Sequence, residues 1–204
     1  EKVKVLCPSP GYDRHFAIAE SLGLELVSVP MTSDGPDMDV VEALVADHSV
    51  KAMFTVPMYA NPDGSIYSDE VCERLAKMEA AADFRVIGDN AYFLQHLDWD
   101  KPATIKEPLA LAKEMGNPNR FVVFASMSKI TYAGSGLAAI AMSEEDFLWM
   151  NKGLGFQTIG PDKMSQRRHM KFFMENGGIE PSMRRHAAFV KPKFDIVLDI
   201  LDEE

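Results

Sequence analysis

Short runs of β-branched and aliphatic residues alternate with segments of helical periodicity along most of the chain. Runs with the length of a buried strand occur at Val3–Cys7, Leu24–Val29, Val50–Val56, Arg85–Gly88, Phe121–Ala125 and Leu137–Met142. Segments with apolar residues three and four positions apart lie between them, at Asp13–Leu22, Asp39–Ala46, Asp69–Ala82 and Glu107–Met115. Strands that alternate with helices in this way predict an α/β fold with a parallel sheet covered on both faces.

The last two predicted strands break the alternation, because the segment from Ser126 to Gly136 is too short for a crossover helix. We therefore expect a three-layer sandwich whose mostly parallel sheet ends in one antiparallel strand. From Ser143 onward the chain is predicted to be helical, with Ser143 and Asp146 framing a capping box. A last helix is predicted over Pro192–Leu201, with the proline in its first turn.

Local signals also predict where several helices begin and end. Ser68 stands where its side-chain oxygen would accept from the first free amides of the third predicted helix. Gly23 and Gly116 stand where the first and fourth predicted helices should stop, since glycine adopts the left-handed conformation found there.

Composition and charge narrow the class of protein. Of the 204 residues, 47% are hydrophobic and 25% charged, which is typical of a soluble globular protein with a large core. The net charge of −10 argues against nucleic acid or an anionic membrane as a partner, since both attract basic surfaces. The two cysteines, Cys7 and Cys72, have neither disulfide-framework nor metal-site spacing, so we predict no metal and a cytoplasmic location.

Chemically versatile side chains gather where four predicted strands end. They are Tyr12 and His15, Asn61, Asp89 and Tyr92, and Ser126, Ser128 and Lys129. Ligands of α/β sheets bind beyond the carboxyl ends of the strands, so these residues are expected at one rim. Each has an ordinary explanation when taken alone. The run Asn61-Pro62-Asp63-Gly64 suits a β-turn, and an aspartate at a strand end commonly caps the next helix.

Together these side chains suit the chemistry of a flat, electron-accepting ring. A lysine in a partly desolvated pocket can attack a carbonyl and form a Schiff base. A carboxylate can keep the nitrogen of a pyridine ring protonated, and an aromatic side chain can stack on such a ring.

The set Asn61-Pro62-x-Gly64, Asp89-x-x-Tyr92 and Ser126-x-Ser128-Lys129 resembles fold-type I pyridoxal-phosphate enzymes, specifically class I aminotransferases. The run Ser-Lys-Ile-Thr-Tyr-Ala-Gly-Ser-Gly, which begins at Ser128, is most similar to a divergent aspartate aminotransferase subgroup. By this resemblance, residues 1–175 are expected to be an excised cofactor-binding large domain whose N-terminal part is missing. Residues 176–204 would be a helical segment leading toward a missing C-terminal small domain.

The resemblance assigns the catalytic roles to Lys129, Asp89 and Tyr92. Lys129 would hold pyridoxal 5′-phosphate in a Schiff base and would move a proton between the substrate and the cofactor. Asp89 would pair with the pyridinium nitrogen of the cofactor. His15 would orient Asp89 from behind, or it is an ordinary buried histidine.

The same resemblance assigns cofactor binding to further residues. Asn61 and Tyr92 would hydrogen-bond the phenolate oxygen, Tyr12 would stack on the ring, and Ser126 and Ser128 would bind the phosphate. The chain departs from the family pattern beyond its lysine, where most class I enzymes carry an arginine that clamps the phosphate and this sequence has a leucine at position 137.

The resemblance implies transamination between an amino acid, aspartate or another dicarboxylic one, and a 2-oxo acid. It also implies a homodimer with shared active sites and an isolated fragment with little or no activity. Arg167 and Arg168 have two interpretations: a solvated helix face, or a fork that reaches a carboxylate of the substrate across the dimer. The alternative functions are a lyase with the same cofactor and the ligand-sensing domain of a transcription regulator.

Overall fold

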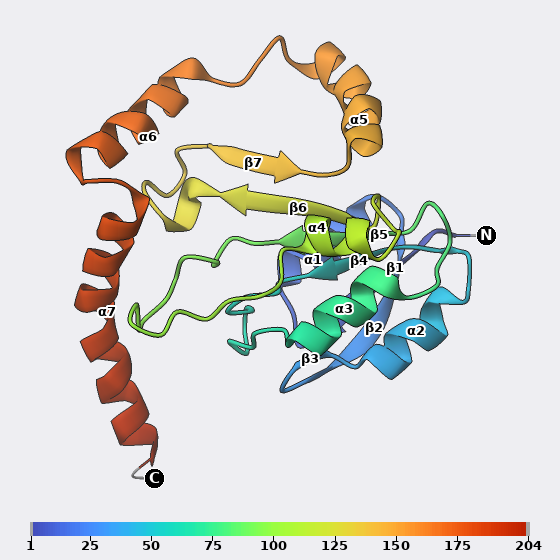
Figure 1. The fold of residues 1–204 in the computed structure, drawn as a ribbon, viewed down its shortest axis with the longest axis horizontal. Helices are drawn as coiled ribbons and strands as arrows, with labels where there is room; N and C mark the ends of the chain where they lie inside the picture. Colours follow the sequence, from blue (N-terminus) through green and yellow to red (C-terminus); the bar gives the residue numbers. More distant parts are fainter. Residues whose placement is uncertain (1, 203–204) are drawn as a thin grey trace.

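In the computed structural model, residues 2–202 are described, and they form a seven-stranded sheet between layers of helices (Figure 1). The strand order is β3-β2-β1-β4-β5-β6-β7. The strands are β1 (Lys4–Ser9), β2 (Glu25–Thr32), β3 (Gly35–Pro36), β4 (Val50–Thr55), β5 (Arg85–Asp89), β6 (Phe121–Ser126) and β7 (Ala138–Ala141). Neighbours from β2 to β6 are parallel, and β7 is antiparallel to β6 as predicted.

The two-residue strand β3 was not predicted, because it is too short to carry a periodic pattern. It pairs antiparallel with the end of β2. Gly35 adopts a φ of 125°, and a Cβ there would lie 3.0 Å from the ring of Tyr67. Glycine is therefore required both by the backbone and by the close approach of this ring.

The helices of the sheet layers are α1 (Asp13–Ser21), α2 (Met38–Val45), α3 (Asp69–Lys77) and α4 (Pro108–Glu114). A single 3-10 turn, η1 (Met127–Lys129), follows β6, and the chain then forms α5 (Glu144–Gln157), α6 (Lys163–Glu175) and α7 (Ile179–Asp202).

Helix α3 ends five positions before its predicted end at Ala82, and the physical reason is a competing set of hydrogen bonds. The carbonyl of Ala76 accepts from Asn117 Nδ2 at 2.9 Å, and that of Met78 accepts from Arg120 Nη2 at 3.0 Å. These side chains satisfy the carbonyls that further helix would have used, so the backbone becomes extended at Met78.

The main core lies between the sheet and the layer formed by α2, α3 and α4. Leu6, Met53 and Val86 project from neighbouring strands into this core and have no measurable exposure. The opposite sheet face is covered less completely, by α1 and the start of α5. A mostly apolar cavity of about 690 Å³ remains on that side, between these two helices and the side chains of β4, β5 and β6.

After β7 the chain runs around the outside of the sheet as α5, α6 and the long helix α7 (Figure 1). Ser143 Oγ accepts from the Asp146 amide at 3.2 Å, as expected for a helix cap. The Asp146 carboxylate, however, binds Arg85 at 2.7 Å and does not return to Ser143, so only half of the predicted capping box forms.

The prediction of a helix that begins near Pro192 was wrong. Helix α7 already begins at Ile179, so Pro192 lies inside it and Pro181 is the proline of the first turn. The two glycines before α7, Gly177 and Gly178, have φ values of 78° and 107° and separate it from α6. A proline inside a helix leaves one carbonyl without its amide partner, which makes this the weakest point of the helix backbone.

Neither cysteine forms a disulfide: Cys7 and Cys72 are both buried free thiols. Burial raises the pKa of each thiol to about 11. Within residues 2–202 no helix is long and apolar enough to cross a membrane.

Candidate active site at the carboxyl edge of the sheet

Four neighbouring strands, β1, β4, β5 and β6, end at the same edge of the sheet and carry the predicted site residues there. Strand pairing places Thr55 of β4 beside Gly88 of β5, and Asp89 of β5 beside Phe124 of β6. Asp89 therefore lies only two positions along the neighbouring strand from Ser126. This register brings together side chains that are far apart in the sequence.

His15 contacts Asp89 directly. It lies in the first turn of α1, and its Nε2 is 3.2 Å from Asp89 Oδ2. The imidazole stacks on Phe54 of β4, with the ring centres 4.7 Å apart and the planes 11° from parallel. Only 8% of His15 is exposed, so its ring is held between the sheet and α1, with one nitrogen directed at the carboxylate.

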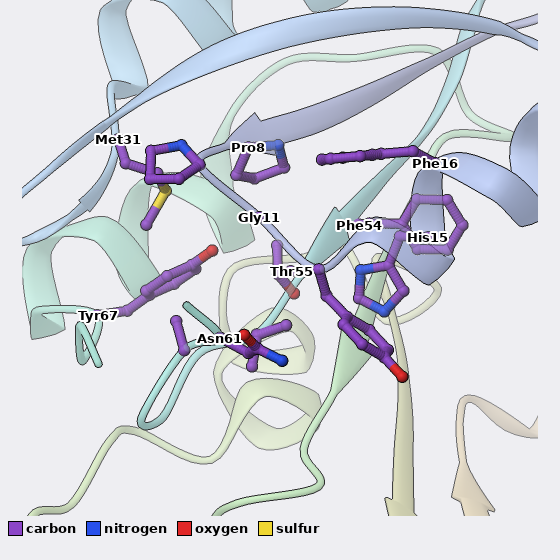
Figure 2. A pocket seen from close by; sticks show the side chains of 13 residues that line it. Pro8, Gly11, His15, Phe16, Met31, Phe54, Thr55, Asn61 and Tyr67 are labelled. Atoms are coloured by element: carbon purple, nitrogen blue, oxygen red, sulfur yellow. The ribbon is translucent and has the colours of Figure 1, made fainter. Parts of the chain in front are cut away.

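Tyr12 and Asn61 lie close to this histidine. Tyr12 precedes α1 and meets the His15 ring edge-on, with 5.3 Å between the ring centres. Tyr12, His15 and Asn61 line one small cavity of about 20 Å³ at the ends of β1 and β4 (Figure 2). Figure 2 shows His15, Phe54 and Asn61 around this cavity, with the ring of Tyr67 directed toward it from the other side.

The turn after β6 carries the hydroxyls and the lysine. Ser126 caps η1: its Oγ accepts from the Ser128 amide at 3.1 Å and donates to Ser128 Oγ at 2.9 Å. Lys129 ends η1, and its Nζ lies 5.9 Å from the centre of the Tyr92 ring, over the ring face. The Tyr92 ring thus presents an aromatic surface to the lysine amine.

The lysine opens onto a large cavity of about 910 Å³. Ser128, Lys129 and Tyr92 line it on the sheet side, and residues of α7, including Met183 and Ala187, form the opposite wall. A cavity of this size is comparable with those that hold cofactors and small substrates in proteins.

The predicted residues do not all share one cavity. Tyr12, His15 and Asn61 surround the small cavity, Tyr92, Ser128 and Lys129 line the large one, and Asp89 and Ser126 border the apolar cavity beside α1. Within residues 2–202, no hydrogen bond or ring contact joins the Lys129 group directly to the His15 group. The two groups are connected through the pairing of β5 with β6.

Three residues at the large cavity were missed by the sequence analysis: Tyr59, Gln95 and His96. The Tyr59 hydroxyl lies 2.6 Å from His96 Nδ1, and Gln95 Nε2 donates to the backbone carbonyl of Lys129 at 2.5 Å. Tyr59 has a φ of 52°, which is unusual for a residue other than glycine. Their positions in the loops after β4 and β5 were the available signal, but nothing local indicates that residues 37 positions apart form a pair.

Burial changes the titration of this pair. It lowers the pKa of His96, so that the neutral imidazole is favoured near pH 7. It raises the pKa of Tyr59, and a hydrogen bond from the backbone of Ala103 opposes this effect. Both side chains are therefore uncharged hydrogen-bonding groups at the cavity.

Arg167 and Arg168 lie on α6, and both side chains are exposed. Their neighbour His169 is buried and lies 2.6 Å from Thr131 Oγ1, measured from its Nδ1. The histidine thus ties α6 to the loop after Lys129, whereas the two arginines face away from the core.

Comparison with known proteins supports the same interpretation. The sequence profile of the family described as "Aspartate amino-transferase" matches residues 1–204. An aspartate aminotransferase from Corynebacterium glutamicum is 48% identical over 203 residues, which cover 99% of this chain and 47% of that protein. The chain thus spans about half the length of this curated relative.

Solved structures agree. The crystal structure of an aspartate transaminase from Corynebacterium glutamicum superposes with a TM-score of 0.94 at 47% identity, covering 100% of this chain and 48% of the other. An α-aminoadipate aminotransferase from Thermus thermophilus, complexed with N-(5′-phosphopyridoxyl)-L-leucine, has the same fold, with a TM-score of 0.84 at 21% identity, covering 100% of this chain and 51% of that one. With a family match along its whole length and a relative of this similarity, the chain belongs to the aspartate amino-transferase family.

Proposed function

We propose that the protein containing this chain uses pyridoxal 5′-phosphate to transfer an amino group between an amino acid and a 2-oxo acid. The observation that carries the proposal is the position of Lys129. Its amine lies over the Tyr92 ring and lines a large cavity at the carboxyl edge of the sheet. Membership of the aspartate amino-transferase family supports the same reaction.

The donor set at this edge fits the cofactor chemically. An aldehyde requires a primary amine, which Lys129 supplies, and a phenolate requires a donor such as the Tyr92 hydroxyl. Paired hydroxyls suit a phosphate, and Ser126 and Ser128 supply them. A pyridinium nitrogen requires a carboxylate, here Asp89 backed by the His15 imidazole. When bound, pyridoxal phosphate supplies a ring that withdraws electrons from the α-carbon of the substrate.

Each side chain has a distinct task in this proposal. Lys129 Nζ would hold the cofactor and, once free, would act as the base that moves a proton between the α-carbon of the substrate and the former aldehyde carbon of the cofactor, two atoms away. The Asp89 carboxylate holds the proton of the ring nitrogen, and His15 fixes the carboxylate from its far side at 3.2 Å. The Tyr92 hydroxyl and Asn61 donate to the phenolate oxygen, and Tyr12 stacks on the ring.

Phosphate binding rests on the turn after β6, since Leu137 replaces the expected arginine. Ser126 and Ser128 present two hydroxyls at the start of η1, joined to each other by a hydrogen bond of 2.9 Å. The proposal assigns residues 1–175 to the cofactor domain and 176–204 to a segment leading toward a small domain. It assigns the protein to a homodimer with shared active sites, and it leaves both interpretations of Arg167 and Arg168 open: a solvated helix face, or a fork that reaches the neighbouring site.

Aspartate or another dicarboxylic amino acid is the proposed amino donor. The name of the Corynebacterium glutamicum relative supports this choice. The polar side chains at the large cavity support it too, since Lys101 and His186 can both donate to a carboxylate.

The test uses the full-length protein, incubated with pyridoxal phosphate and reduced with borohydride before peptide mass mapping. A pyridoxyl adduct is expected on Lys129 and is lost in Lys129→Ala. Lys101→Ala is the matched control, because Lys101 lines the same cavity and its loss should leave the adduct in place. Labelling scattered over surface lysines would contradict the proposal.

The reaction itself is tested by adding aspartate and following the amino group. Formation of oxaloacetate together with the aminated cofactor supports transamination. Release of carbon dioxide with formation of alanine would identify a decarboxylating lyase instead. Retention of the cofactor without any turnover would identify a ligand-binding protein of the same fold.

A further inference from the structure

The pair formed by Tyr59 and His96 lies at the Lys129 cavity but has no role in the reaction described above. We propose that His96, held by Tyr59, donates its Nε2–H to the distal carboxylate of a dicarboxylic substrate and so determines substrate specificity. This inference rests on the proposed function, because it concerns the substrate of the same site.

Hydrogen bonding fixes which nitrogen of His96 carries the proton. The Tyr59 hydroxyl faces the backbone amide of Ala103, from which it accepts, and its own proton is then available to His96 Nδ1 at 2.6 Å. A neutral imidazole that accepts at Nδ1 carries its proton on Nε2. His96 thus has one nitrogen committed to Tyr59, and the other is a donor on a residue that lines the cavity.

Aromatic contacts hold the His96 ring in one orientation. The Trp99 ring meets it edge-on, with the ring centres 4.8 Å apart, and Tyr59 does the same at 5.7 Å. The Arg184 guanidinium of α7 lies 5.1 Å from the centre of the Trp99 ring. Only 8% of His96 is exposed. A donor fixed in this way loses little conformational entropy when it binds a ligand.

The position of His96 is also fixed relative to the reacting lysine. The residue before it in the chain, Gln95, donates to the carbonyl of Lys129. Two consecutive residues are therefore anchored, one to the backbone of the lysine and the other to Tyr59. A substrate whose amino-bearing carbon lies at Lys129 would extend its side chain into this cavity. These two bonds fix the separation of Lys129 and His96 that the side chain must span.

The charge around the cavity favours a carboxylate. Besides Lys129, which holds the cofactor, Lys101 and His186 line it as donors, whereas Asp98 is its acidic lining residue. The negative charge of Asp98 acts on Lys191 of α7, so it is partly compensated. A neutral but rigid donor such as His96 adds directional selectivity to this electrostatic attraction, since a hydrogen bond to an ion depends on geometry.

The test compares two unreactive acids of equal chain length, succinate and butyrate, which differ in the distal carboxylate. Their dissociation constants are measured by isothermal titration calorimetry on the full-length, cofactor-loaded protein. His96→Asn keeps an acceptor near Nδ1 but removes the Nε2 donor, and it should weaken succinate binding about ten- to a hundredfold. Butyrate binding should change by less than about twofold.

Two further variants separate a specificity role from a structural one. His96→Gln places an amide nitrogen near the Nε2 position and should restore most of the succinate affinity. Tyr59→Phe keeps the ring but frees Nδ1, so it should weaken succinate binding less than His96→Asn does. For His96→Asn, the KM for aspartate should rise more than kcat falls, because the contact is with the bound substrate. Because each variant has its own expected effect on succinate binding, the proposal can still be tested if one of them fails to fold.

His48→Asn, a change at an exposed histidine between α2 and β4, serves as the matched control and should bind both acids normally. Equal weakening of succinate and butyrate by His96→Asn would overturn the proposal in favour of a structural role. Unchanged succinate binding would overturn it as well. If Lys129 is not labelled in the borohydride experiment, the proposed function fails first. If Lys129 is labelled in His96→Asn but succinate binding is normal, only this inference fails.

Discussion

At the scale of single residues, Gly11 shows how a missing side chain shapes the site. A Cβ at this position would lie 2.2 Å from the carbonyl oxygen of Pro8, which no backbone can accept without moving. Gly11→Ala is therefore expected to displace the loop that carries Tyr12. It should lower the free energy of unfolding by about 1–3 kcal/mol in urea titrations followed by circular dichroism.

Gly153→Ala is the matched control for this substitution. Gly153 lies inside α5, and a Cβ there would meet nothing within 4 Å. Alanine should raise the free energy of unfolding by up to about 1 kcal/mol, because glycine is a poor helix former. Equal effects of the two substitutions would show that the clash at Pro8 does not exist in solution.

His96 gives the protein a pH-dependent stability of known sign. Its pKa in the folded state is lowered from its usual value of 6.5 by burial, so the unfolded chain binds the proton more readily. The stabilisation is fully present above pH 6.5 and is lost as the pH falls through the folded-state pKa. The urea midpoint should fall on acidification below that pH, and His96→Asn should reduce this part of the pH dependence. If the urea midpoint of His96→Asn depends on pH as it does in the unsubstituted protein, His96 is not the source of this pH dependence.

The place of the predicted set in the fold could be predicted from the sequence because each residue follows a strand and belongs to a short motif. Lys129 and Asp89 are examples, since strand ends fix their place in the fold. Tyr59 and His96 could not be found in the same way. Their contact depends on how two loops without a periodic pattern pack against each other. It also depends on Trp99, in the same loop as His96, and on Arg184 of α7, which packs on Trp99.

At the scale of elements, one ion pair fastens α5 to the sheet. Asp146, in the first turn of α5, accepts from Arg85 Nε at 2.7 Å and from Nη2 at 2.9 Å, and both side chains are mostly buried. Asp146→Asn should therefore lower the free energy of unfolding by about 1–3 kcal/mol, because a two-pronged, partly buried charge pair is broken.

The control for this prediction is Asp195→Asn. Asp195 pairs with Lys191 on the surface of α7, with about half of each side chain exposed. Such exposed pairs contribute less than about 0.5 kcal/mol, so urea unfolding should hardly change. Similar losses in both variants would show that Arg85 and Asp146 contribute no more than a surface pair.

Helix boundaries were predictable where a local signal decides them. Gly23 and Gly116 adopt φ values of 70° and 81° where α1 and α4 stop, and Ser68 Oγ accepts from the Val71 amide at 3.2 Å to begin α3. The end of α3 was not predictable, because distant side chains bind its last carbonyls. Pro192 misled the analysis for the opposite reason: a local preference for the first turn was overridden by the length of α7.

At the scale of the whole molecule, large apolar side chains remain exposed on the outer helices. Trp149, Phe156 and Ile159 are 78%, 95% and 108% exposed on and after α5. The 204-residue chain expressed by itself should therefore associate, eluting above its 22.7 kDa mass and binding a hydrophobic dye. Light scattering coupled to gel filtration measures this directly.

Replacing Phe156 and Ile159 together by serine should reduce both the apparent mass and the dye binding. A monodisperse species of 22.7 kDa that binds no dye would contradict the prediction for the unsubstituted chain. The layered α/β architecture followed from periodicity along the chain. The homodimer and the division at residue 175 remain predictions, since they depend on surfaces and segments that lie outside local patterns.

Helix α7 has a mechanical consequence that follows from its length. It contains 24 residues and so measures about 36 Å, with Met183 and Ala187 buried near one end and an exposed run from Ile196 to Leu201 at the other. A rotation of roughly 5° about the buried end moves the other end by about 3 Å. Bending is easiest at Pro192, which absorbs part of that rotation. Residues of α7 from Met183 to Phe194 form one wall of the Lys129 cavity, so a force on the end near Leu201 reaches the site as a small angular displacement of that wall.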